Sequence, residues 1–174
     1  MRGSRPHRES IEVELSQIVK LERPTKMLQI KDLLATARMR LLTIGADHQL
    51  TEAASLLSEP GRRMVVVCNR LGEMVGVLTR TDVVRQIRNC HGCACMAECA
   101  TVMSADVCFC RPEHWVRDVW SMMKDRGFVD VPIADSEGKP IGLVTARDAL
   151  EMLLLETEYN DKMLIDYIMC VGYQ

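Results

Sequence analysis

A nine-residue element occurs twice in this 174-residue chain, and the two copies are 66 residues apart. The copies are MVGVLTRTD at positions 74–82 and PIGLVTARD at positions 140–148, and both read apolar-Gly-apolar-apolar-Thr-x-x-Asp. The same offset relates Gly61 to Gly127 and Gly72 to Gly138, so the match continues without a gap over about forty residues. We therefore expect a duplicated unit whose two copies bury their apolar sheet faces together around an approximate two-fold axis.

Each copy of the element predicts a strand that turns directly into a helix. The branched apolar residues before the threonine are typical of a strand. Thr79 and Thr145 occupy N-cap positions, and Asp82 and Asp148, three residues later, complete the pattern of a capping box. The N-terminus of such a helix carries unpaired N–H groups and the positive end of the helix dipole, which favour a phosphate or another anion.

The flanking residues repeat the same order of elements. Periodicity predicts helices at 47–59 and 116–126, buried strands at 64–68 and 129–133, and turns at 69–72 and 135–138. The fold class is α/β in the mixed α+β sense, with two β-α-β-β-α repeats packed as a pseudo-two-fold pair and an N-terminal helix. The expected divisions are a tail and helix (1–26), repeat 1 (27–89), a Cys-rich linker (90–99), repeat 2 (100–156) and a C-terminal helix extension (157–174).

Composition narrows the classes of partner. The net charge of −2 does not favour a nucleic-acid or membrane surface. The sequence contains neither a run of 18 apolar residues nor a signal-peptide pattern, so we expect a cytoplasmic protein. Its eight cysteines would then be reduced or bound to a metal rather than paired in disulfides.

The duplicated element and the Val-Pro-Ile strand at 131–133 resemble a tandem pair of cystathionine-β-synthase (CBS) domains, known as a Bateman module. The resemblance covers about residues 27–156. It implies two clefts between the paired repeats, which in many members bind AMP, ADP, ATP or a related adenosyl compound. A Thr-x-x-Asp sequence can also be a helix cap alone, and its occurrence in both repeats favours a binding role for at least one copy.

The resemblance also assigns roles to residues. It implies that Asp82 and Asp148 accept hydrogen bonds from ribose hydroxyls and that Thr79 and Thr145 lie near the ribose or phosphate. Arg147 matches a frequent phosphate contact, whereas Arg80 lies one position earlier in its repeat. The strand residues that would flank the base are Val65, Val66, Val131 and Pro132. Val66 departs from the family pattern, because proline is usual at that position.

The linker between the repeats departs further from the family. Cys90, Cys93, Cys95 and Cys99 form a C-x₂-C-x-C-x₃-C pattern, and four thiolates can hold zinc or an iron–sulfur cluster. The same cysteines can equally be unligated thiols at a helix end, and a redox pair is a third interpretation. The spacing does not match a zinc ribbon.

The sequence shows no constellation of catalytic residues, so we do not expect an enzyme. The leading hypothesis is a regulatory module that binds an adenine nucleotide and transmits a conformational change to an unidentified regulated protein. The apolar C-terminal helix predicts a homodimer. The alternative is a metal- or redox-sensing module that uses the Cys90–Cys99 cluster.

Overall fold

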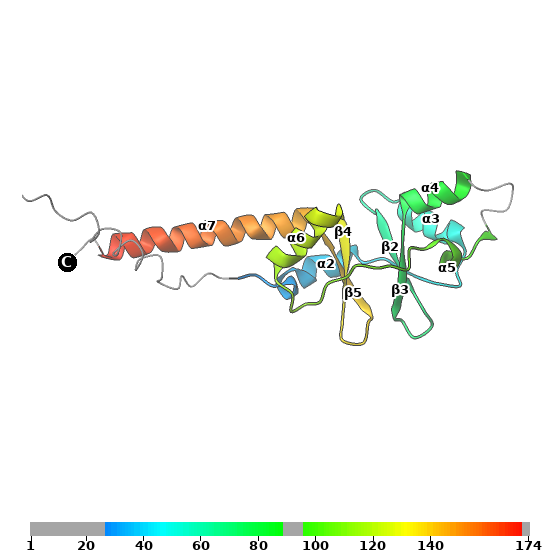
Figure 1. Ribbon diagram of the computed structural model, residues 1–174, viewed down its shortest axis with the longest axis horizontal. Helices are drawn as coiled ribbons and strands as arrows, with labels where there is room; N and C mark the ends of the chain where they lie inside the picture. Colours follow the sequence, from blue (N-terminus) through cyan, green and yellow to red (C-terminus); the bar gives the residue numbers. More distant parts are fainter. Residues whose placement is uncertain (1–26, 89–95, 172–174) are drawn as a thin grey trace, which may run out of the picture.

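The computed structural model describes residues 27–88 and 96–171. The N-terminal helix expected within residues 1–26 and three cysteines of the linker, Cys90, Cys93 and Cys95, lie outside these ranges. Figure 1 shows two groups of strands and helices side by side, with one long helix extending away from them.

The first repeat contains a three-stranded sheet in the order β1-β2-β3. Strand β1 (Thr43–Gly45) is parallel to β2 (Met64–Cys68), which is antiparallel to β3 (Met74–Thr79). Helix α3 (Leu50–Ser58) connects β1 to β2, and α4 (Arg80–Arg88) follows β3 without an intervening loop. These elements are preceded by the short 3₁₀ helix η1 (Ile30–Leu33) and by α2 (Leu34–Arg40).

The second repeat has the same order with a reduced first strand. Helix α5 (Cys99–Val102) precedes it, α6 (Val116–Arg126) leads into β4 (Asp130–Ala134), and β5 (Pro140–Thr145) is antiparallel to β4. The counterpart of β1 is a single parallel bridge between Cys110 and Ile133. Helix α7 (Ala146–Val171) follows β5 directly.

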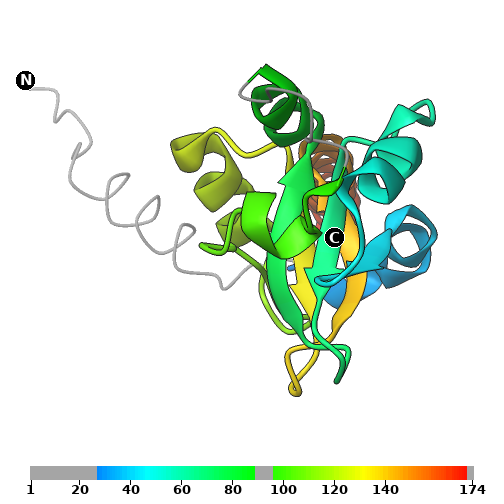
Figure 2. The same ribbon diagram turned by 90° about the vertical axis from the view of Figure 1, so that its right-hand side faces the viewer.

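The two repeats agree in strand register. Met64 pairs with Thr79 in the first hairpin and Asp130 with Thr145 in the second, and both hairpins have an irregularity before their last pair. The backbone N–H of Met74 donates to the carbonyl of Gly138 at 3.0 Å, which joins the hairpins to each other. In Figure 2 the two sheets lie one behind the other with helices around them. The duplicated mixed α/β fold is confirmed.

The helix before each repeat packs on the opposite repeat. Helix α2 lies against β5 of the second repeat, and α5 lies against β3 of the first (Figure 1). A side chain on Gly142 of β5 would meet the Cβ of Ala37 at 3.0 Å, and one on Gly76 of β3 would meet Met103. The glycine in each copy of the repeated element therefore permits the close approach of the segment that packs on it, which contains Ala37 or Met103.

Because each of these helices packs on the opposite repeat, the apolar clusters of the core combine residues of one repeat with residues of the helix that precedes the other. One cluster joins Ile30, Leu33 and Ala37 to β4, β5 and α6 of the second repeat. Another joins Cys99 to α3, β2 and β3 of the first repeat. Each repeat thus depends on a segment that precedes the other, so we expect the two repeats to fold as one cooperative unit.

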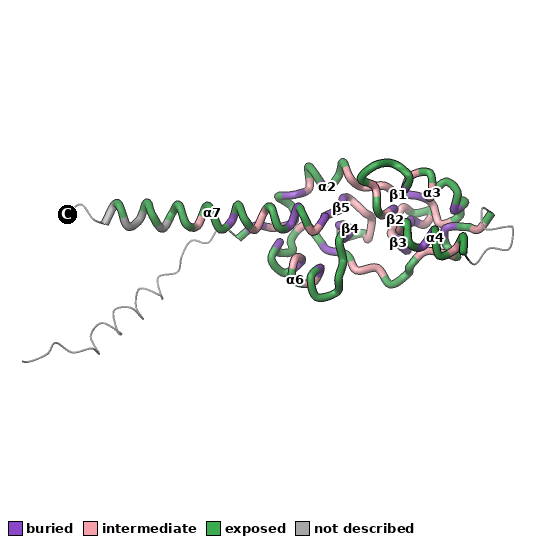
Figure 3. The backbone as a smooth tube through the Cα atoms, turned by 90° about the horizontal axis from the view of Figure 1, so that it is seen from above, coloured by how far each residue is buried: buried purple, intermediate pink, exposed green. Residues whose placement is uncertain are grey.

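Helix α7 extends beyond the paired repeats, and most of the described residues in its outer part are exposed (Figure 3). The carboxylate of Glu156 is 4% exposed and accepts a hydrogen bond from Arg117 of α6 at 3.1 Å, which fixes the inner part of α7. Among the described residues, no helix is both long enough and apolar enough to cross a membrane.

Candidate functional site

The predicted capping boxes are present at both strand-to-helix corners. At the second corner, the backbone N–H and the hydroxyl of Thr145 donate to the Asp148 carboxylate at 3.1 and 2.7 Å. The same two groups of Thr79 donate to Asp82 at 2.9 and 2.7 Å. Both aspartates are buried, with residue exposures of 8% for Asp82 and 6% for Asp148. The sequence therefore places a fixed carboxylate at each corner.

Each carboxylate has a different arginine partner. Asp148 accepts a hydrogen bond from the guanidinium of Arg40, the last residue of α2, which also donates to the Thr145 hydroxyl at 3.3 Å. Asp82 accepts from Arg85 of its own helix at 3.0 Å. The partner of Asp148 is thus separated from it by 108 residues, whereas that of Asp82 is one helical turn away.

The environment of Asp148 favours its ionised form. Burial acts to raise its pKa, but hydrogen bonds from Arg40 and from the hydroxyl and backbone N–H of Thr145, together with the charge of Arg40, hold the pKa below its usual value. Asp148 is therefore a carboxylate at neutral pH and can accept hydrogen bonds from hydroxyl groups of a ligand.

The two arginines predicted to contact phosphate have other partners here. The Arg147 guanidinium is 85% exposed and pairs with Glu151 at 2.7 Å, an interaction that raises the pKa of Arg147. Arg80 donates to the carbonyls of Leu57 and Glu59 at 2.8 and 2.9 Å, at the C-terminal end of α3. Arg147 has room to reorient, whereas Arg80 would have to leave two backbone carbonyls to reach a phosphate.

The residues predicted to flank the base lie on the central strands. Val65 and Val66 belong to β2, and Val131 and Pro132 occupy the equivalent positions of β4. All four side chains are essentially fully buried. A ligand in this region would therefore meet the backbone and end of the strand before it met these side chains.

A cluster of arginines at the second corner was not predicted from the sequence. The Arg62 guanidinium donates to the carbonyls of Met39 and Arg40, both at 3.3 Å. Arg63 makes two hydrogen bonds to Asp130, at 2.7 and 3.0 Å, and Asp130 is the cross-strand partner of Thr145. The sequence does contain a signal of this cluster. Two adjacent arginines precede β2, whereas the equivalent residues before β4 are Phe128 and Val129.

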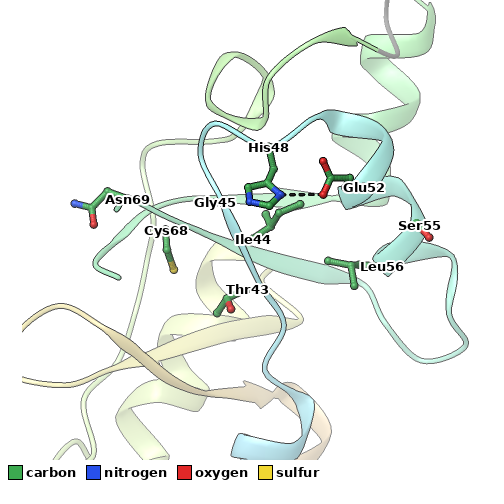
Figure 4. Close-up of a pocket in the computed structure, with 9 residues that line it drawn as sticks. All are labelled: Thr43, Ile44, Gly45, His48, Glu52, Ser55, Leu56, Cys68 and Asn69. Carbon is green, nitrogen blue, oxygen red and sulfur yellow. Dashed lines mark hydrogen bonds and ion pairs between the residues drawn. The ribbon is translucent and has the colours of Figure 1, made fainter. Parts of the chain in front are cut away.

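A separate pocket of about 560 Å³ lies beside β1 and α3 (Figure 4). Its lining includes Cys68, His48 and Glu52, and the last two are hydrogen-bonded at 2.9 Å. This hydrogen bond and the charge of Glu52 raise the pKa of His48. Neither Asp82 nor Asp148 lines this pocket, so it lies apart from the predicted nucleotide site.

Cys68, Cys99 and Cys110 are buried in the core, and Cys108 is partly buried. Cys99 is fully buried, its sulfur lies 3.7 Å from the Gln49 carbonyl, and burial raises the pKa of its thiol. Burial likewise raises the pKa of Cys110 to about 12. Residues 27–88 and 96–171 contain no group of three His, Cys, Asp or Glu side chains arranged to hold a metal. They lend the predicted metal site no support, and its other three cysteines are outside these ranges.

Comparison with known proteins agrees with this architecture. The family model "CBS domain" matches residues 30–89 and 99–155. The chain is 28% identical over 116 residues to the uncharacterized protein MK0525 of Methanopyrus kandleri, and the match covers 67% of this chain and 59% of that relative. This chain thus spans less than two thirds of the length of that curated relative.

Solved structures with a similar fold include two described with bound adenosyl ligands. One is the CBS domain pair of protein MJ0100 in complex with 5′-methylthioadenosine and S-adenosyl-L-methionine, with a TM-score of 0.61, 20% identity, and coverage of 73% of this chain and 96% of that chain. The other is CBSX2 in complex with AMP, with a TM-score of 0.62, 20% identity and the same two coverages. At this identity the likeness establishes the fold alone.

Proposed function

This chain belongs to the CBS-domain family, and from that premise we propose that it is a regulatory module that binds an adenine nucleotide or a related adenosyl ligand. The observation that carries this proposal is the pair of buried carboxylates, Asp82 and Asp148, each fixed by the threonine of the same motif. Each aspartate also caps its helix, and the same buried carboxylate can serve both roles.

The chemistry of the corner suits a nucleoside. A ribose offers two adjacent hydroxyls, and one carboxylate can accept a hydrogen bond from each. Thr79 or Thr145 would lie beside the ribose, and the purine would lie along β2 or β4 near Val65, Val66, Val131 and Pro132. Arg147 is exposed and could turn toward a phosphate, and Arg80 is the corresponding candidate in the first repeat.

The adenosyl compounds named for MJ0100 and CBSX2 support this class of ligand.

The arrangement of this chain also suggests how binding would be transmitted. Arg40 ends α2, which packs on the second repeat, and Asp148 lies in the first turn of α7, so a ligand at this corner would contact or displace α2. A shift of α2 would change the packing of the two repeats, and a partner protein could respond to that change.

We include a homodimer in the proposal. Leu150, Leu154 and Leu155 of α7 are 44%, 56% and 56% exposed, although they lie in the part of the helix nearest the repeats. Exposed leucines in adjacent turns of one helix are a common basis for helix–helix association. A second copy of this chain would cover them and could carry the conformational change between subunits.

Titration calorimetry with AMP and ATP tests the ligand assignment. We expect Asp148→Ala and Asp82→Ala each to weaken binding at its own corner by about tenfold or more, because each removes a charged hydrogen-bond acceptor. Asp125→Ala, at an exposed position of α6, is the matched control and should bind as the wild type does. Ligand should also raise the midpoint of thermal unfolding of the wild type.

Two results would count against the proposal. Absence of any heat or thermal shift with AMP, ATP or S-adenosylmethionine would remove the nucleotide assignment. Binding that is equally strong in Asp82→Ala, Asp148→Ala and the wild type would move the site away from the two corners. Circular dichroism of each variant shows whether the fold is retained.

A further inference from the structure

The carboxylate expected to receive a ribose in the second repeat is already occupied by a side chain of the protein. The Arg40 guanidinium pairs with Asp148 and donates to the Thr145 hydroxyl, so it contacts both side chains of the corner. The Asp148 side chain is only 7% exposed, whereas that of Arg40 is 37% exposed. The carboxylate is thus fixed, and the arginine that covers it has an open side toward solvent.

Two further arginines lie beside this pair. Arg62 contacts the backbone of Arg40, and Arg63 pairs with Asp130 beside Thr145. Arg62 also pairs with the exposed carboxylate of Glu59 at 3.6 Å, so Arg40 is the arginine whose acidic partner is a predicted ribose acceptor.

The first corner, at Thr79 and Asp82, lacks this set of residues. The 66-residue offset aligns Arg40, Arg62 and Arg63 with Asp106, Phe128 and Val129. The partner of Asp82 is Arg85, and the residue aligned with Arg85 is Glu151, which pairs with Arg147 instead. The two corners therefore share their threonine and aspartate but differ in the arginine that contacts the aspartate.

We propose that Arg40 is a displaceable cover over Asp148 and makes the second corner selective for adenosyl ligands with an anionic 5′ group over neutral or cationic ones. This inference rests on the proposed nucleotide function and specifies the ligand class of one site. It assigns a role in ligand selection to a residue outside both copies of the repeated element.

The selectivity follows from charge balance. The Arg40 guanidinium contacts Oδ2 of Asp148, so a ribose whose two hydroxyls donate to both carboxylate oxygens must displace it, and breaking a charge-assisted contact is costly unless both groups find new partners. The ribose hydroxyls satisfy Asp148. A 5′-phosphate on the same ribose is close enough to receive the released guanidinium, whereas adenosine leaves the guanidinium without an anion and the sulfonium of S-adenosylmethionine adds a like charge.

Calorimetry with AMP and adenosine in an Asp82→Asn background tests the proposal, because that background confines the measurement to the second corner. The parent should bind AMP more tightly than adenosine. Arg40→Met should tighten adenosine binding and weaken or preserve AMP binding, so that the preference for AMP falls by about tenfold or more. Arg40→Lys retains the charge and should preserve part of the preference. Arg38→Met, an exposed arginine on the same helix, should leave it unchanged.

The outcomes separate this inference from the proposed function. If Arg40→Met leaves the ratio of the two dissociation constants unchanged while Asp148→Ala abolishes binding, the role of Arg40 is wrong and the nucleotide site stands. If neither AMP nor adenosine binds the parent or Arg40→Met, the nucleotide assignment of this corner fails together with the inference. A merely structural role for Arg40 would weaken both ligands equally.

Discussion

Gly142 of β5 faces Ala37 of α2 so closely that a Cβ on the glycine would lie 3.0 Å from the Ala37 Cβ and 3.1 Å from Cδ1 of Ile133. The same relation holds between Gly76 and Met103, which are the equivalent residues of the other contact. Both copies of the repeated element have glycine at the same position, and packing explains this independently of any ligand.

Replacement of Gly142 by alanine should destabilise the protein by about 1–3 kcal/mol, because the added methyl group overpacks a rigid contact that includes backbone atoms. Gly76→Ala should also destabilise the protein, because an added Cβ would lie 2.7 Å from Cγ and 3.1 Å from Cβ of Met103. Urea unfolding of both variants measures these losses of stability. A Gly142→Ala variant as stable as the wild type would contradict the close approach of α2 to β5.

The packing of α2 and α5 on the opposite repeats could not be predicted from the sequence. The 66-residue offset predicted the hairpins, their turns and the two capping boxes, because these depend on residues close in sequence. It could not place α2 on the second repeat, since that contact joins segments about a hundred residues apart. For the same reason the sequence predicted Asp148 as a site residue but missed Arg40, which covers it.

The first strand of the second repeat is shorter than the sequence predicts. The expected β-α-β-β-α order places a strand before α6, but this segment forms one bridge, at Cys110. The first repeat has Thr43–Gly45 at the equivalent position. Pro112 follows Cys110 closely and cannot donate a ladder hydrogen bond, which is consistent with the shorter pairing.

The low pKa of Asp148 predicts a dependence of stability on pH. A carboxyl group with a lower pKa in the folded state than in the unfolded state contributes stability above its unfolded pKa, and this contribution is lost as the pH falls through the folded pKa. The difference in unfolding free energy between the wild type and Asp148→Asn should therefore be largest near neutral pH and should shrink between about pH 5 and pH 3. Urea titrations across this range provide the measurement, and a difference that is independent of pH would contradict the assignment.

The ion pair of Arg63 with Asp130 joins the two repeats and should contribute to their association. Asp130 is 7% exposed and Arg63 is 52% exposed, so Arg63→Met would leave a buried carboxylate without its charged partner. We expect a loss of about 1–2 kcal/mol, less than for a fully buried pair because solvent screens the arginine. Arg147→Met is the matched control, since its pair with Glu151 is exposed and screened by solvent and should contribute little to stability. Equal effects of the two substitutions in urea unfolding would show that Arg63 has no special role.

The exposed leucines of α7 give the last prediction, which concerns assembly. If a second copy of the chain covers this helix, Leu154→Lys should place an unpaired charge in an apolar contact and convert the dimer to a monomer. Light scattering coupled to gel filtration measures the mass of each species against the 19.7 kDa chain. Glu158→Lys, one turn further along α7 at an exposed polar position, introduces the same side chain and should remain dimeric. A wild-type protein that elutes as a monomer at all concentrations would contradict the proposed dimer, and a Leu154→Lys dimer would place the contact on another face.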